Sequence, residues 1–384
     1  MIRLEKRVET PRWIGFAVPV FSVFAALVVG GLMLAVTGRN PFEVYRRILE
    51  RGFLGDGAFE SALEVSSPLL YTGLAAAVAF RMGVFNIGGD GQFIMGSIFG
   101  SGVALLMDGQ PNILTIAAMI AAGLIGGAVW SLIPALLRAF ASTNEIITTL
   151  MLNYVAARIA MYLIFFSQSH WRDLSPSGRQ FPSPRQIPES AEWLPIPIGG
   201  IYVLQGLVIG VVLAVMLFVL YRSTRFGFEV RVVGDSPSAA RYSGMSTRRK
   251  IITVMALSGA VAGLGGAANV GDSRHGLDAK SLSTSGYGYT GIVIAALARF
   301  NPLAVVVVSV LLGGLNNAGR SLQGKDFPAG LVGTLQGLIL LFALGGELFG
   351  RYRLRRRGAR PASSVDSTSA DASPGAVPPE VAPA

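Results

Sequence analysis

The chain has 384 residues, of which 52% are hydrophobic and only 14% are charged. Since about a quarter of the residues of a soluble domain are charged, this composition excludes an ordinary soluble protein and predicts several membrane-spanning segments. The absence of cysteine excludes disulfides, thiolate nucleophiles and cysteine-bound metals. The two histidines, His170 and His275, fall in different predicted loops, which argues against a histidine-bound metal.

Ten apolar segments are candidates for membrane spans, because a bilayer core of about 30 Å requires roughly 20 apolar residues per helix. We therefore expect an all-α polytopic membrane protein with about ten transmembrane helices and with both termini in the cytoplasm. The first segment follows a basic start but is too long for the apolar core of a signal peptide, so it is interpreted as a retained anchor. The expected spans are 13–36, 66–82, 91–107, 112–137, 146–167, 200–221, 251–270, 287–299 (a short one), 303–319 and 327–349.

The formal net charge of +10 could indicate nucleic-acid binding, but the positions of the basic residues favour another interpretation. With the N-terminus inside, the tightest clusters of Lys and Arg, 222–250 and 351–360, both fall on the cytoplasmic side, while Arg158 lies within a span. Cytoplasmic loops of membrane proteins carry an excess of Lys and Arg. The charge is therefore interpreted as a topology signal, and no nucleic-acid partner is expected.

The chain divides into a cytoplasmic N-terminus (1–12), a transmembrane domain (13–350) and a cytoplasmic tail (351–384) that begins with basic residues. The rest of the tail is rich in Pro, Ala and Ser and lacks aromatic residues, so it is expected to be disordered. Within the domain, the outer loop 167–198 shows no helical period and could be a lid, a docking surface or a plain connection. A second long loop, 222–250, is expected on the cytoplasmic side.

The first polar interruption of the apolar sequence is FNIGGDGQFIMG, at 85–96. Its glycines permit an interrupted helix, and such backbone persists at membrane depth only where protein or water surrounds it. Asn86 and Gln92 offer neutral donors and acceptors that suit an uncharged, polyhydroxylated solute. Asp90 would cost roughly 2.5–3.5 kcal/mol at the centre of a lipid-facing helix, so it should lie at a helix end, in a cavity or against a cation such as Arg81. The alternative is a tight cytoplasmic turn between two spans, which would still line the inner end of a pathway.

A second polar stretch, STNEIITTLMLNY, occupies 142–154. Thr143 and Glu145 are explained by helix capping and by the attraction of a carboxylate to a helix N-terminus. Asn144 shares a helical neighbourhood with the threonines that follow it, and Asn153 lies about two turns further on. A buried amide needs hydrogen-bond partners, so Asn153 either faces a polar pathway or is bound within the protein.

The third stretch is the cytoplasmic loop 221–250. Asp235 or Ser236 can cap a short helix over 238–243, which follows a proline. Gly244 can end this helix. A helix about 10 Å long is marginal alone in water, so docking must stabilise it. It could be a lever pushed by a cytoplasmic partner or a loop helix packed on its own protein.

Two apparent nucleotide-binding patterns are rejected. GRSLQGKD, at 319–326, has Asp326 where a P-loop needs Ser or Thr, and it follows an apolar helix on the outer side. GLGGAA, at 263–268, matches a dinucleotide fingerprint only in spacing and lies inside a span, where helix packing is the ordinary explanation of glycines. Because neither a nucleophile–base pair nor a metal cluster is apparent, the chain is not expected to be an enzyme.

Four runs of residues occur in order over about residues 60–349. They are FNIG (85–88) with GQ (91–92), NEI (144–146) with LMLNY (150–154), FEVRVVG (228–234) with AARYSG (239–244), and GIV (291–293) with AL (296–297), Arg299 and NPL (301–303). With these runs the chain resembles the permease subunits of ATP-binding-cassette importers, in the nucleoside and simple-sugar branch related to the ribose and branched-chain amino-acid permeases. The chain departs from that family at Asp90, where Glu is usual, and its outer loop and C-terminal tail have no clear counterpart.

The resemblance implies a division of labour between chains. It implies a cytoplasmic ABC ATPase that binds ATP and Mg²⁺, a second permease subunit (a sister chain or a second copy) and an extracytoplasmic solute-binding protein, with the permease in the lipid bilayer of the bacterial plasma membrane. This chain itself then needs no cofactor, and residues 236–244 look like the coupling helix that enters a groove on the ATPase. The residues assigned to coupling are Glu229, Arg231, Ser238, Ala240, Arg241 and Gly244, and those assigned to the substrate pathway are Asn86, Asp90, Gln92, Asn144 and Asn153.

We therefore expect a permease that admits a nucleoside, or else a simple sugar, by alternating access driven by a separate ATPase. The alternative from another class is a stand-alone ion-coupled secondary transporter of a small polar solute. That transporter would need intramembrane carboxylates, and Asp90 and Glu145 are the candidates. Neutral amides suit ribose hydroxyls and nucleobases equally, while the Asn-Ile-Gly…Gly-Gln form looks closer to the nucleoside branch.

Overall fold

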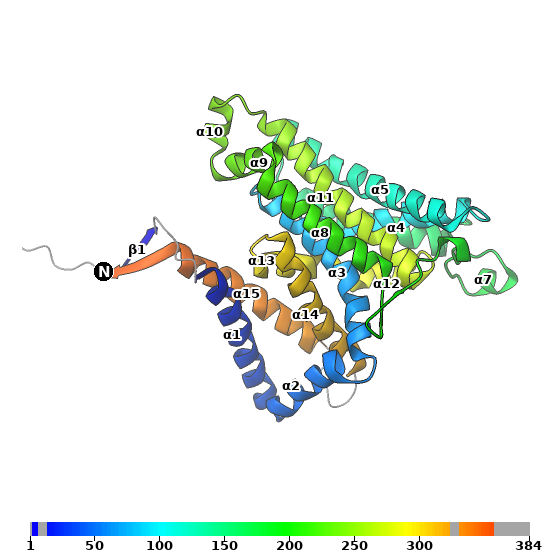
Figure 1. Cartoon of the computed structure of the whole chain (residues 1–384), viewed down its shortest axis with the longest axis horizontal. Helices are drawn as coiled ribbons and strands as arrows, with labels where there is room; N and C mark the ends of the chain where they lie inside the picture. The colour runs from blue at the N-terminus through cyan, green and yellow to red at the C-terminus, as the bar shows by residue number, and fades with distance from the viewer. Residues whose placement is uncertain (1, 7–13, 323–329, 357–384) are drawn as a thin grey trace, which may run out of the picture.

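The computed structural model describes residues 2–6, 14–322 and 330–356, which form a mainly helical protein whose long helices pack together (Figure 1). The helices are α1 (Ile14–Val36), α2 (Pro41–Leu49), α3 (Ala58–Phe80), α4 (Gly89–Leu106), α5 (Asn112–Ala141), α6 (Glu145–Met161), α7 (Pro176–Gln180), α8 (Gln205–Ser223), α9 (Arg225–Asp235), α10 (Pro237–Tyr242), α11 (Thr247–Asn269), α12 (Ala279–Ser285), α13 (Tyr287–Leu297), α14 (Pro302–Ser321) and α15 (Leu331–Arg351). Short π-helical segments lie at Glu50–Leu54, Tyr162–Phe166 and Val270–Arg274, and a 3-10 turn lies at Glu189–Ala191.

Four short strands depart from the all-α expectation. They form two antiparallel pairs, β1 (Ile2–Lys6) with β4 (Tyr352–Arg356) and β2 (Ile196–Ile198) with β3 (Ile201–Val203). The tail expected to be disordered lies outside the described residues from 357 onward, as does 323–326 of the rejected P-loop pattern.

Every expected span coincides with a helix, but length and hydropathy support a smaller number than ten. α4 follows a polar connection, and α13 has only 11 residues, which is about 16 Å of helix. Within the described residues, the segments long and apolar enough to cross a membrane are Ala58–Phe80, Asn112–Ala141, Glu145–Phe166, Gln205–Ser223, Thr247–Arg274 and Pro302–Ser321, with Val20–Val36 and Leu331–Ala343 as shorter apolar stretches.

The eighth expected span, 287–299, coincides with α13, which is only the second piece of a helical segment broken at Gly286. α12 has 7 residues and is separated from α13 by Gly286, whose φ of 60° ends the first piece in the left-handed region that favours glycine. The first piece includes several Ser and Thr, which is why hydrophobicity alone locates only the second piece.

Glycines set the distances between the central helices α4, α5 and α11. A Cβ atom added to Gly96 would lie 2.0 Å from the carbonyl oxygen of Gly263, and one added to Gly127 would lie 2.1 Å from that of Gly259. Backbones approach this closely only where no side chain stands between them. The packing therefore fixes the position of α4 along α11, and with it the position of the first turn of α4.

The two ends of the long helices carry different structures (Figure 1). α9 and α10 project at one end, and α7 lies at the opposite end. The loop 167–198, which includes α7, packs against the ends of the long helices. The backbone N–H of Trp193, a residue only 1% exposed, donates to the carbonyl oxygen of Gly271 at 3.1 Å. The indole N–H of Trp171 donates to the carbonyl oxygen of Ile98 at 3.0 Å. These contacts pack the loop onto α4 and onto the end of α11.

Candidate functional site

The connection between α3 and α4 is partly buried: Gly83 and Phe85 are exposed, whereas the polar side chains that follow are not. Asn86 is 3% exposed and Gln92 is 1% exposed. The first turn of α4 contacts Asn153, which lies about 12 Å along α6 from its start. The chain thus enters the bundle as irregular backbone over 84–88 before α4 begins at Gly89. Buried irregular backbone requires a partner for each polar group, and those partners form the candidate site.

Asn86 is the centre of a closed hydrogen-bond network. Its Nδ2 donates to Oε1 of Gln92 and to Oγ of Ser258, both at 2.9 Å, and its Oδ1 accepts from Nε2 of Gln92 at 3.0 Å. The same Oδ1 accepts from the backbone N–H of Gly88 at 3.0 Å, and Ser258 in turn donates to the carbonyl oxygen of Ala75 at 2.6 Å. The two amides therefore join the connection to α3 and α11.

α6 holds the other side of the connection with three side chains spaced four residues apart. Oε1 of Glu145 accepts from the N–H of Phe85 at 3.4 Å, and Oγ1 of Thr149 accepts from the N–H of Ile87 at 3.2 Å. Asn153 accepts from the N–H of Gly91 at 2.8 Å and donates to the carbonyl oxygen of Ile87 at 2.9 Å. Residues at i, i+4 and i+8 share one helix face, so this spacing could have identified Glu145 and Thr149 as partners of Asn153.

Glu145 forms an ion pair with α5 in addition to its hydrogen bond to the connection. Its side chain is 8% exposed, and its Oε2 lies 3.2 Å from Nε of Arg138, near the end of α5. A buried carboxylate needs both a cation and hydrogen bonds, and here Arg138 and the Phe85 N–H supply them. Glu145 thereby joins the end of α5 and the start of α6 to the connection.

Asp90 lies where two helix N-termini meet. Its Oδ1 accepts from the backbone N–H of Gly288, in the first turn of α13, at 2.7 Å. A Cβ atom on Gly288 would lie 2.4 Å from the backbone nitrogen of Asp90, so the contact requires glycine there. A carboxylate is favourable at a helix N-terminus, and this one serves α4 and α13 together. The expectation of a helix-end position is confirmed, whereas Arg81 is not its partner: that guanidinium lies 5.0 Å from the ring centroid of Tyr221.

Asn144 is separate from this cluster. It is exposed, and its Oδ1 caps α6 by accepting from the N–H of Ile146 at 2.9 Å. The expectation that Thr143 caps this helix is therefore wrong. Of the five residues assigned to the pathway, the structure thus brings together Asn86, Gln92 and Asn153, places Asp90 beside them, and leaves Asn144 outside.

The short helix predicted over 238–243 is confirmed, one residue earlier, as α10. Oγ of Ser236 caps it by accepting from the N–H of Ala239 at 3.3 Å, and Gly244, with a φ of 76°, ends it. Ala240 is fully buried, whereas Tyr242 is 94% exposed. The other residues assigned to this helix, Ser238, Arg241 and Gly244, are also exposed.

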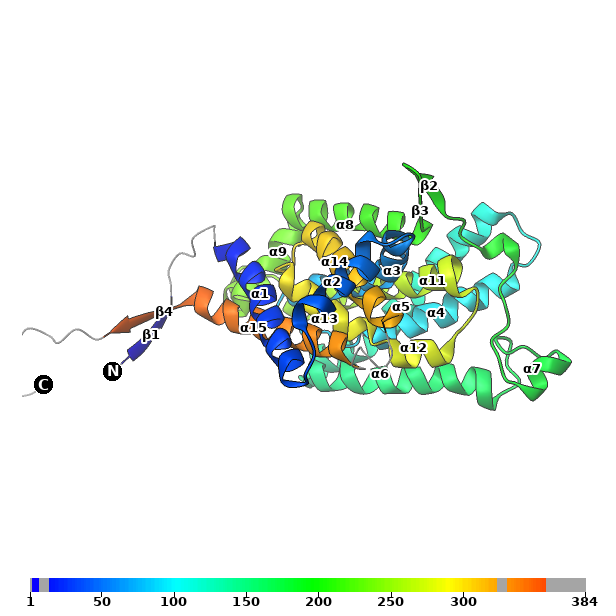
Figure 2. The same ribbon diagram turned by 90° about the horizontal axis from the view of Figure 1, so that it is seen from below.

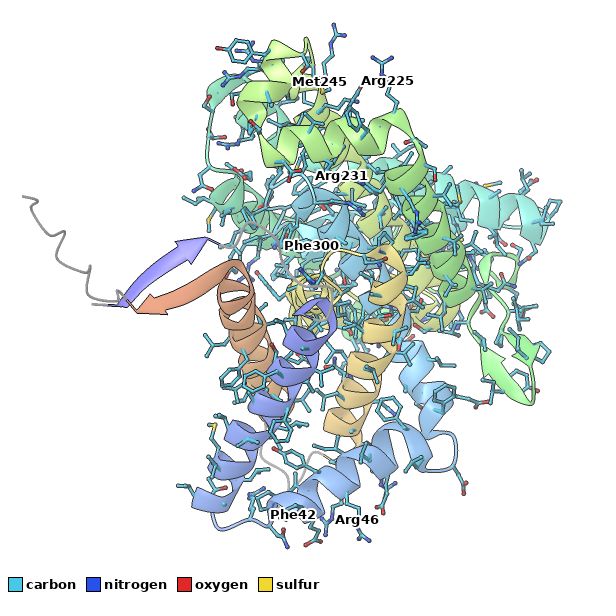
Figure 3. The ribbon with its side chains drawn as sticks, turned by 60° about the vertical axis from the view of Figure 1, so that its left-hand side comes forward. Phe42, Arg46, Arg225, Arg231, Met245 and Phe300 are labelled. Atoms are coloured by element: carbon cyan, nitrogen blue, oxygen red, sulfur yellow. The ribbon has the colours of Figure 1, made fainter. Side chains whose placement is uncertain are left out.

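The sequence interpretation missed α9, the longer helix that precedes α10. Thr224 caps it by accepting from the N–H of Gly227 at 3.3 Å, and Val230 and Val233 are buried on its inner face. This cap and the spacing of the two valines are signals that could have predicted the helix. Figure 3 shows Arg225, at the start of α9, and Met245, after α10, at the same end of the molecule.

Glu229 and Arg231 of α9 differ in their contacts. Glu229 pairs with Lys250 of α11 and with Arg225, whose Nε lies 2.9 Å from Oε1. Hydrogen bonds from Lys250 and then Arg225 lower the pKa of the Glu229 carboxyl. Arg231 is exposed. Glu229 therefore joins α9 to α11 within this chain. Within the part of the chain that the structure describes, no group of three His, Cys, Asp or Glu side chains is placed to hold a metal ion.

Comparison with known proteins shows one family. A family profile described as branched-chain amino acid transport system / permease component matches residues 58–344. The glucose ABC transporter permease protein TsgB13 of Haloferax volcanii is 33% identical, with 97% of this chain and 98% of that protein covered. The guanosine ABC transporter permease protein NupP of Bacillus subtilis is 31% identical over 89% of this chain and 97% of that protein. The nucleoside ABC transporter permease protein NupB of Lactococcus lactis is 27% identical over 85% and 89%, respectively.

Proposed function

This chain belongs to the family of branched-chain amino acid transport system permease components, and we propose that it is the membrane-spanning subunit of an ATP-binding-cassette importer for a nucleoside or a simple sugar. The observation that carries the proposal is the family match over 58–344, supported by similarity to glucose, guanosine and nucleoside permeases over most of the chain. A chain of this kind is a transport subunit and not itself an enzyme.

The α10 end is the proposed contact with a cytoplasmic ABC ATPase, which would bind ATP and Mg²⁺. One side of α10 is packed on the protein at the buried residue Ala240. The tip of α10, Arg241 and Tyr242, is exposed and available to another protein. Exposed Tyr and Arg are the residue types enriched at the centres of protein interfaces. Because Glu229 joins α9 to Lys250 of α11, a push on α10 would reach α11, which packs against α4 at its glycines.

This arrangement supports alternating access. The α10 end and both termini would lie on the cytoplasmic side of the bacterial plasma membrane. A second permease subunit, either a sister chain or a second copy, would complete the pathway, and a solute-binding protein would deliver the solute at the α7 end. The domain divisions at 1–12, 13–350 and 351–384 are retained as part of this proposal.

We assign Asn86, Gln92 and Asn153 to the support of the pathway wall. Their amides hold the irregular backbone of 84–88, and this backbone sets the position of Asp90 against α13. Asn144 is assigned to the start of α6 as its cap.

The stand-alone ion-coupled transporter is the less favoured alternative. Its candidate carboxylates already have partners, because Asp90 accepts from Gly288 and Glu145 pairs with Arg138. An ion-binding carboxylate would need to be free to exchange its ligand. Among the solutes, we favour a nucleoside, for which two of the three relatives above are named.

Uptake into vesicles that contain the permease, its ATPase and the solute-binding protein tests the proposal. Arg241→Glu and Gly244→Pro are expected to abolish ATP-driven uptake while the complex still inserts and the ATPase still hydrolyses ATP. Arg46→Glu is the matched charge reversal, since Arg46 is an exposed residue on α2, far from the loop (Figure 3). Normal uptake by both loop variants would refute the role of α10, and ATP-independent uptake abolished by an uncoupler would establish the secondary transporter.

A further inference from the structure

α6 carries a polar stripe on its outward face. Figure 2 shows α6 along one edge of the molecule. Only 28% of the most apolar part of the Glu145–Phe166 span is buried, against 89% for the span of α3. Tyr154, Arg158 and Tyr162 are four residues apart and so share a face, on which the tyrosines are 61% and 58% exposed and Arg158 is exposed as well.

Arg158 is placed where lipid would be unfavourable. It lies about 20 Å along the helix from Glu145 and about 12 Å before Phe166. Over residues 2–6, 14–322 and 330–356 its guanidinium forms no hydrogen bond or ion pair. Helical side chains lean toward the N-terminus, so this one leans away from the nearer end of the span and is poorly placed to reach water there. A charged side chain inside a membrane protein normally faces the bundle interior or a water-filled cavity.

The stripe continues onto the broken helix. Tyr289, in the first turn of α13, is 42% exposed and follows Gly288, whose backbone N–H donates to Asp90 at 2.7 Å. Tyr154 in turn follows Asn153, which accepts from the N–H of Gly91 in the first turn of α4. The exposed aromatic and cationic groups are therefore continuous with the place where the N-termini of α4 and α13 meet. Discontinuous helices at membrane depth are typical of solute sites in transporters.

We infer that this stripe lines the water-filled passage beside a second permease subunit, and that Arg158 binds the solute there through a nucleobase edge with two adjacent acceptors. This inference rests on the proposed function and narrows its substrate class. A guanidinium has donors in a planar fork and no acceptor. It can bind O6 and N7 of guanine or hypoxanthine together, whereas adenine presents an amino donor beside N7. Tyr154, Tyr162 and Tyr289 would provide aromatic faces on which a base can stack.

The absence of cysteine permits a direct test of the passage. In the assembled transporter, Tyr154→Cys and Tyr162→Cys are expected to react with a charged, membrane-impermeant thiol reagent, and saturating guanosine should slow the reaction. Met216→Cys, on α8, is the matched control, because Met216 is 62% exposed on an apolar surface that would face lipid. If the two stripe cysteines react no faster than the one at position 216, the stripe does not line a passage.

The specificity part of the inference is tested by uptake kinetics. Arg158→Gln and Arg158→Lys both remove the fork, so each is expected to raise KM for guanosine and inosine about tenfold or more and to leave KM for adenosine unchanged. Arg51→Gln, at an exposed position beyond α2, should change neither. An equal change for adenosine and guanosine, or none, refutes base-edge recognition by Arg158. A wild-type complex that hydrolyses ATP but imports no nucleoside contradicts the proposed nucleoside substrate, while the cysteine labelling still tests the passage.

Discussion

The amide cluster around Asn86 and the tip of α10 use polar residues in opposite ways. In the cluster, the side chains of Asn86, Gln92 and Asn153 are almost fully buried, and their amides bind each other, the Ser258 hydroxyl or the backbone of this chain. At the tip, Arg241 and Tyr242 project from a helix whose caps are already satisfied. A buried polar group without a partner is destabilising, so the first region must be complete within the chain. The second can leave surface free for another protein.

The largest effect is expected from Asn86→Leu. It would leave the Gly88 N–H and the Gln92 amide buried without partners, and since each unsatisfied group costs about 1–3 kcal/mol, the loss of stability should exceed about 3 kcal/mol. The thermal midpoint of the purified permease measures it. Asn144→Leu is the matched control, because that amide is an exposed cap. A folded Asn86→Leu variant with a normal midpoint and a raised KM would make Asn86 a solute ligand. The amide cluster would then not be complete within the chain.

Tyr242→Ser tests the other region. Because Tyr242 is 94% exposed, the thermal midpoint should not change. Loss of an aromatic interface residue is expected to reduce ATP-driven uptake about tenfold or more. Phe42→Ser, at an 85% exposed position on α2, is the control and should transport normally. A large fall in the midpoint of Tyr242→Ser would mean that the tip is part of the fold and not a free surface.

Glu229→Gln tests the ion pair that connects α9 to Lys250 of α11. Hydrogen bonds from Lys250 and Arg225 lower the pKa of the Glu229 carboxyl in the folded protein, so the ionised group stabilises the fold above its ordinary pKa of 4.5. This contribution is lost as the pH falls through the lowered value. The midpoint of the wild type should therefore exceed that of Glu229→Gln at pH 7, and the two should converge below pH 4.5. A constant difference across this range would point to a cause other than the charge.

The smallest effect is expected at the cap of α6. Asn144→Ala should lower stability by about 1 kcal/mol, and Asn144→Ser, which keeps a capping oxygen, should lower it by less. Uptake kinetics should be unchanged for both, since Asn144 lies outside the cluster. A raised KM in the serine variant would return Asn144 to the substrate pathway.

Much of the fold could be predicted because its signals are local. Apolar length located a helix for each expected span, and the capping chemistry of Ser236 and Gly244 located α10 to within one residue. The break at Gly286 could not be found in this way, because α12 is too polar to register as part of a span.

By itself, the sequence determined that this protein is built of membrane helices, where those helices run, and that certain amides and carboxylates would need partners. Only the tertiary structure decided which partners they have: Ser258 for Asn86, the Ile87 and Gly91 backbone for Asn153, and the Gly288 N–H, 198 residues away along the chain, for Asp90. The physical reason is that a buried polar group must form hydrogen bonds, but burial does not determine which group is its partner. Packing of the helix backbones at their glycines makes that choice.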